Sequence, residues 1–149
     1  MAKSLLLDFE EEINYSIIGI SSSYKDYRLM FFLNKIDEFE FKRAEPFTFS
    51  YNKTKFKYSL YTFIDDVNLR NFYLIANKSN AVKLVKKYQY FDYLLIMDGE
   101  IDTAFLKELS KKVKSVSGVV LTAILDDNEF NKIPNLRVEF DIHLDAVLS

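Results

Sequence analysis

Strand-like segments follow one another from residue 47 to residue 76 with only short joins, and this constrains the fold more than any other feature of the sequence. Phe47, Phe49 and Tyr51 alternate with polar residues, which is the period of two expected for a strand with one buried face. Parallel neighbours need long crossover connections, which these joins are too short to provide. The sequence therefore predicts a mostly antiparallel sheet.

Further segments complete the predicted sheet. Residues 58–64 and 70–76 read as the two strands of a hairpin. Residues 91–97 and 119–125 are almost continuously apolar, which is typical of central strands. Together with a strand that ends at Ser21, and with 119–125 as the first of one or two strands that close the chain after the second helix, we expect about five or six strands.

An amphipathic helix is predicted directly after the run of three serines. Ser23, with Asp26 three residues later, reads as a capping box in which Asp replaces the usual Glu. Its apolar residues are spaced at i, i+3, i+4 and i+7, so they would all face the sheet; they are Leu29, Phe32, Leu33 and Ile36.

A second amphipathic helix is predicted to begin after Asp102 as its N-cap and to stop at Gly118. Lysines occupy the opposite side and the last turns, where positive charge suits the helix dipole. Its apolar stripe consists of Phe105, Leu106, Leu109, Val113 and Val116.

These elements predict a two-layer α+β fold, a mostly antiparallel sheet of about five or six strands with both helices on one face. A chain of 149 residues fits one domain, and we expect a single domain over 1–149 with 141–149 as a candidate C-terminal tail. Consecutive strands without Pro-rich or Gly-rich linkers agree with this expectation.

Composition excludes several classes of function. The chain has no Cys, a single histidine at His143, and only three glycines, so zinc sites, catalytic triads and phosphate-binding glycine loops are not predicted. A net charge of −2 argues against a dedicated binder of nucleic acid. No apolar run is long enough for a signal peptide or a membrane span, so we expect a cytoplasmic protein without metal or cofactor.

Two features could form a binding site near the start of the first helix. Ser22 and Ser23 offer either helix caps, which we favour, or an anion site at the helix start. Asp92 interrupts an apolar strand, so it either faces outward or pairs with Arg28 or a lysine where helix and sheet meet. The candidate binding residues are Ser22, Ser23, Tyr27, Arg28, Asp92 and Tyr93, and none of them is predicted to be catalytic.

The segment from Tyr51 to Tyr61 interleaves lysines with aromatic residues. Such interleaving is typical of platforms on which single-stranded nucleic acid stacks. It is also typical of an edge strand whose lysines prevent sheet-to-sheet pairing while its rings enter the core. We favour the second interpretation.

Several segments resemble an uncharacterised bacterial family named IPExxxVDY after its signature. The resemblance rests on Gly19–Ser22, Asp26–Leu29, Leu33–Lys35, Tyr73–Ser79 and Phe91–Met97 and extends from about Leu5 to Leu125. The signature would fall on Val85–Tyr93, where Lys86 and Lys87 replace Pro and Glu, and Phe91 replaces Val. The resemblance implies no particular activity.

Three hypotheses for function remain. The first is a non-catalytic interaction protein that acts as a homodimer, because aromatic residues in excess of one core often cover an interface. The second is an enzyme or small-ligand-binding domain with a pocket near the start of the first helix. The third is binding of single-stranded nucleic acid.

Overall fold

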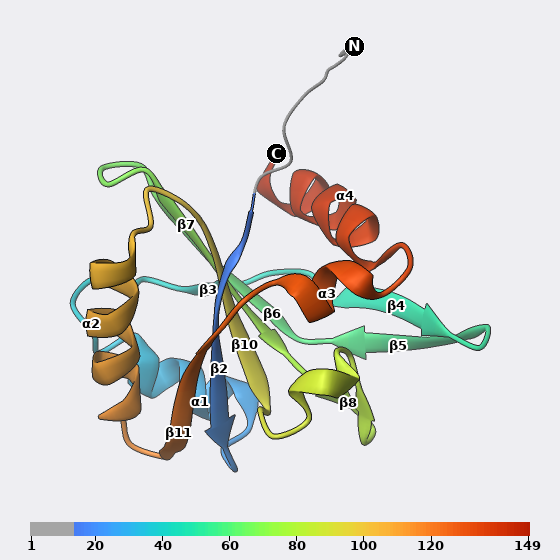
Figure 1. Ribbon diagram of the computed structural model, residues 1–149, viewed down its shortest axis with the longest axis horizontal. Coiled ribbons are helices and arrows are strands. Elements are labelled where there is room, and N and C mark those ends of the chain that lie inside the picture. The colour runs from blue at the N-terminus through green and yellow to red at the C-terminus, as the bar shows by residue number, and fades with distance from the viewer. Residues whose placement is uncertain (1–13) are drawn as a thin grey trace.

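The computed structural model describes residues 14–149 and is built on a six-stranded sheet with the strand order β11-β2-β10-β7-β6-β3 (Figure 1). Every neighbouring pair in it is antiparallel, so the predicted α+β fold is confirmed. Its strands are β2 (Ser16–Ser22), β3 (Lys42–Arg43), β6 (Leu60–Asp65), β7 (Arg70–Ala76), β10 (Tyr93–Gly99) and β11 (Val119–Leu125).

Two small hairpins and a short helix lie outside this sheet. The first hairpin consists of β4 (Phe47–Tyr51) and β5 (Thr54–Tyr58), and the second of β8 (Lys78–Ser79) and β9 (Val82–Lys83). A single 3-10 turn, η1 (Lys86–Tyr88), follows. The predicted alternation in β4 is confirmed, because Phe47 and Phe49 are buried whereas Thr48 and Ser50 are exposed.

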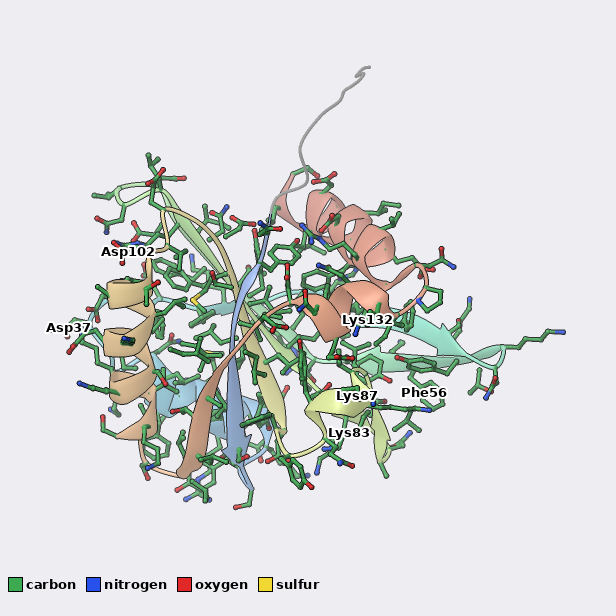
Figure 2. All side chains as sticks on the ribbon, in the orientation of Figure 1. Asp37, Phe56, Lys83, Lys87, Asp102 and Lys132 are labelled. Carbon is green, nitrogen blue, oxygen red and sulfur yellow. The ribbon has the colours of Figure 1, made fainter. Side chains whose placement is uncertain are left out.

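Both predicted helices cover the same face of the sheet (Figure 1). They are α1 (Asp26–Leu33) and α2 (Thr103–Lys114), and each is shorter than its apolar pattern indicated. Leu29 and Leu33 of α1 and Leu109 and Val113 of α2 are buried against the strands. The predicted N-cap is confirmed, since the Asp102 carboxylate accepts a hydrogen bond from the Phe105 amide at 2.7 Å at the start of α2 (Figure 2).

The second face of the sheet carries a third layer that the sequence did not predict. It consists of the β4–β5 hairpin and two helices, α3 (Asn128–Lys132) and α4 (Leu136–Leu148) (Figure 1). Of the one or two expected closing strands, only β11 forms among the described residues, and most of the candidate tail at 141–149 belongs to α4. Leu136, Phe140 and Leu144 of α4 are buried, and the His143 ring donates a hydrogen bond from Nε2 to the Glu45 carbonyl at 2.8 Å.

Two further expectations about the second half of the chain need correction. The strand at 119–125 is not central, because β11 forms an edge of the sheet and none of its seven residues is fully buried. Helix α2 ends at Lys114 with Ser115 as its C-cap, four residues before the expected stop. Gly118 instead occupies the turn into β11 with φ of +86°, a conformation that side chains with a Cβ rarely adopt.

Gly19 lets the Phe91 ring lie directly on β2. A Cβ atom at this position would stand 2.6 Å from Cγ of Phe91, well inside van der Waals contact. The ring belongs to the core beneath the third layer, where aromatic groups such as Tyr15, Tyr73 and Phe140 meet edge to face. Gly19 is thus required by close packing.

We expect Gly19→Ala to lower the free energy of unfolding by about 1–3 kcal/mol, the usual cost of overpacking a core. The measurement is urea denaturation of the wild-type chain, the single variant, Phe91→Ala and the double variant. In the Phe91→Ala background the added methyl group meets no ring, so there Gly19→Ala should cost little. An equal cost in both backgrounds would show that Phe91 is not what excludes a Cβ.

Candidate functional site

An open cleft of about 690 Å³ lies where β2 and β7 end and β10 begins, at the lower end of the sheet in Figure 1. The start of α1 forms another side. The cleft therefore occupies the place that the sequence predicted for a pocket. It is lined by Ser21, Ser22, Ser23, Tyr24, Lys25, Asp26, Ser59, Ala76, Lys78, Asp92, Tyr93 and Val120.

Asp92 lines this cleft, and its side chain connects β2 with β8. Its carboxylate accepts a hydrogen bond from the Ser22 amide at 2.9 Å and forms an ion pair with Lys78 at 3.7 Å. The expected lysine partner is thus present, and Arg28 is not the partner. Asp92 lies just before β10 and its side chain is 26% exposed, so it is not a buried charge within a strand.

Asn77 holds the segment that places Asp92. Its side chain is fully buried, accepts a hydrogen bond from the Val85 amide at 2.9 Å, and donates to the carbonyls of Tyr88 and Phe91 at 3.1 and 3.0 Å. Its backbone amide donates to the Asp92 carbonyl at 2.8 Å. One amide side chain therefore fastens the whole connection between β9 and β10 to the end of β7.

We expect Asn77→Leu to destabilise the fold by on the order of 3 kcal/mol or more, because buried polar groups of Val85, Tyr88 and Phe91 would lose their partner. Urea denaturation measures the change. Asn128→Leu is the matched control, since the Asn128 side chain is exposed and makes no hydrogen bond among residues 14–149. A loss no larger than that of the control would contradict the role given to Asn77.

The serines do not cap the helix, so the predicted capping box is wrong. The N-cap of α1 is Lys25, and its side chain accepts no hydrogen bond from the backbone amides of the first turn. Ser22 is still part of β2, and its hydroxyl accepts a hydrogen bond from the Tyr24 amide at 3.1 Å. Ser23 is exposed at the rim of the cleft. The helix starts later than expected because the strand runs on through Ser22.

Tyr93 and Tyr24 both line the cleft, and a hydrogen bond joins them. The Tyr93 hydroxyl donates to the Tyr24 carbonyl at 2.6 Å. Burial raises the pKa of the Tyr93 phenol, and the carboxylates of Asp26 and Asp92 raise that pKa further. This phenol is therefore a neutral hydrogen-bond donor and is not suited to act as a base.

Arg28 and Tyr27 do not line the large cleft. The Arg28 guanidinium stacks 4.3 Å from the centre of the Tyr24 ring. Both residues border a smaller hollow of about 370 Å³ together with Ser23, Tyr24 and Lys25. Of the six predicted binding residues, Ser22, Ser23, Asp92 and Tyr93 thus share the large cleft, and Tyr27 and Arg28 do not reach it.

Asp26, which the sequence analysis assigned only to the capping box, contributes a polar group to the cleft. Its carboxylate accepts a hydrogen bond from the Tyr61 hydroxyl at 3.2 Å and lies 3.5 Å from Arg43. Arg43 in turn donates to the Tyr61 oxygen at 3.1 Å. No sequence signal marked this triplet, because its members come from α1, β3 and β6. Every carboxylate in the cleft therefore already has partners within the chain.

A second surface lies along β11, outside the predicted site. Val120, Leu121 and Ile124 are 70%, 47% and 45% exposed, and within residues 14–149 no strand pairs with the outer edge of β11. A groove of about 440 Å³ runs between this edge and α2. It is lined by Lys107, Ser110, Lys111, Lys114, Leu121, Thr122 and Ile124.

The lysine-rich hairpin strand β5 keeps its rings inside. Lys55 and Lys57 are exposed, whereas Tyr58 is fully buried and Phe56, labelled in Figure 2, packs partly into the core. The aromatic rings of β5 therefore do not form an exposed platform on which nucleic-acid bases could stack.

Among residues 14–149, no three histidine or acidic side chains come together in a group that could hold a metal ion. In the same part of the chain, no helix is both long and apolar enough to cross a membrane.

No family model matches the chain, and no curated protein matches it in sequence comparison. The resemblance to the IPExxxVDY family stays a prediction. Three of the segments that carry it, Gly19–Ser22, Tyr73–Ser79 and Phe91–Met97, lie next to one another in and beside β2, β7 and β10. Lys86 and Lys87 fall in η1, and the ammonium group of Lys86 lies 5.6 Å from the centre of the Tyr51 ring.

Proposed function

We propose that this chain is a non-catalytic interaction protein that binds a strand of another chain along the free edge of β11. The observation that carries the proposal is the contrast between the two edges of the sheet. The edge at β3 is two residues long and consists of Lys42 and Arg43. Short, charged edges of this kind are how proteins prevent further pairing.

The edge at β11 is neither short nor charged. Its seven residues, Val119–Leu125, include no charged residue and no Pro. Unpaired amide and carbonyl groups along such an edge are a template for an added strand. A long apolar edge of this kind either promotes aggregation or serves as a binding surface, and we propose that it is a binding surface.

A homodimer was expected because the chain is rich in aromatic residues. Most of those rings lie in the two cores, and among residues 14–149 only Tyr27, Phe31 and Tyr90 are largely exposed. The remaining support for a homodimer is therefore β11 itself, through pairing with β11 of a second copy. The partner strand is thus either that second copy or a segment of a different protein. A cytoplasmic setting suits either one, given the absence of cysteine.

We expect the neutral peptide Thr-Val-Thr-Val-Thr-Val-Thr to slow hydrogen exchange at residues 119–125 of the full chain. Leu121→Lys/Ile124→Lys should abolish this protection, because lysines guard an edge against pairing. The matched control is Val138→Lys/Ile142→Lys, which changes two apolar residues on α4 that are at least as exposed. Light scattering of the same proteins gives the mass in solution. A monomer whose β11 amides no strand peptide protects would contradict the proposed function.

Binding of a small ligand in the cleft is the second candidate, supported by the four predicted residues that line it. A ligand that binds there should raise the unfolding temperature of the wild-type chain by mass action. The same ligand should fail to stabilise Asp92→Asn, which loses the ion pair with Lys78. Support for single-stranded nucleic acid is weaker, because the rings of β4 and β5 face the core.

A further inference from the structure

The groove beside β11 has a strong charge preference, and this bears on the identity of the partner strand. Lys107, Lys111 and Lys114 lie at i, i+4 and i+7 on α2, so they form one stripe along the groove. All three side chains are exposed, and none forms an ion pair with any residue in 14–149. Lys112, on another side of the helix, is paired with Glu38.

This stripe disfavours a second copy as the occupant. Antiparallel pairing of β11 with β11 of a second copy continues the sheet through a two-fold axis perpendicular to it, so both α2 helices would lie on the same face. The two lysine stripes would then meet across the axis. Six like charges would then lie on the same side of the joined sheet and repel one another, with a reach of about one Debye length, roughly 8 Å at physiological ionic strength.

The same stripe favours a strand with acidic side chains. Thr122 faces α2, because its hydroxyl lies 3.0 Å from that of Ser110, whereas Ala123 and Leu125 pack into the core on the opposite face. Successive residues of a strand point to opposite faces. Every second residue of an added strand would therefore face the lysines, and the residues between would extend the apolar face.

We infer that the edge of β11 binds an extended segment of a different protein, about as long as the seven residues of β11, in which acidic residues alternate with apolar ones. This inference rests on the proposed function and names the partner's chemistry. Backbone hydrogen bonds to β11 supply the pairing, and the three ammonium groups select the acidic sequence.

The test uses the full chain and a fluorescently labelled peptide, Glu-Val-Glu-Val-Glu-Val-Glu, in an anisotropy titration. We expect it to bind and to protect residues 119–125 from hydrogen exchange, and the peptide with Lys in place of Glu to bind at least about tenfold more weakly. Lys107→Glu/Lys111→Glu/Lys114→Glu should weaken binding of the acidic peptide by about tenfold or more, because three attractive charge contacts are replaced by repulsion. Lys55→Glu/Lys57→Glu/Lys87→Glu is the control with the same change of net charge and should leave binding intact.

The outcomes separate this inference from the proposed function. If acidic and basic peptides protect β11 equally, the edge binds strands without charge selection, so the inference is wrong and the proposed function stands. The same holds if no peptide binds and the chain is a dimer that Leu121→Lys/Ile124→Lys dissociates. Binding of the acidic peptide without protection of 119–125 would show a merely ionic contact and would overturn the inference. A monomer that binds no peptide overturns both.

Discussion

The buried amide of Asn77 is the interaction on which one whole end of the molecule depends. It is the only amide or charged side chain that is fully buried among residues 14–149, and its carbonyl oxygen and amide hydrogens are all engaged with the backbone between Val85 and Phe91. Because an unpaired polar group in such a place is costly, the connection into β10 has one conformation. That conformation positions Phe91 on Gly19 and brings Asp92 to the Ser22 amide.

Two cores, one on each face of the sheet, explain the high aromatic content. α1 and α2 close the first, with Phe39, Phe41 and Phe72 in contact edge to face. α3, α4 and the β4–β5 hairpin close the second, which contains Tyr15, Phe130 and Phe140. A sheet that is covered on both faces can be extended only at its edges, and β11 is the longer of the two edge strands.

The period of two predicted most of the sheet, and the period of 3.6 predicted both helices on its first face, because in these elements one periodicity clearly dominates. The C-terminal helix was missed since Val138, Phe140, Ile142 and Leu144 alternate as in a strand, while Leu136, Phe140 and Leu144 also fit a helix. The structure buries the second set and exposes Val138 and Ile142. Asp92 and its surroundings were recognised from one charged residue in an apolar run, but the edge position of β11 depends on strand order, which no local pattern encodes.

The unequal edges of the sheet also limit how far association can proceed. An added strand can extend the sheet at β11, whereas the two-residue strand β3, with Lys42 and Arg43 both exposed, offers almost nothing at the other end. A molecule whose sheet can pair at one edge only cannot form a filament, because a filament needs a second pairing surface on each molecule. Growth therefore terminates after a single pairing event, and a long uncharged edge strand can stay open without seeding fibres.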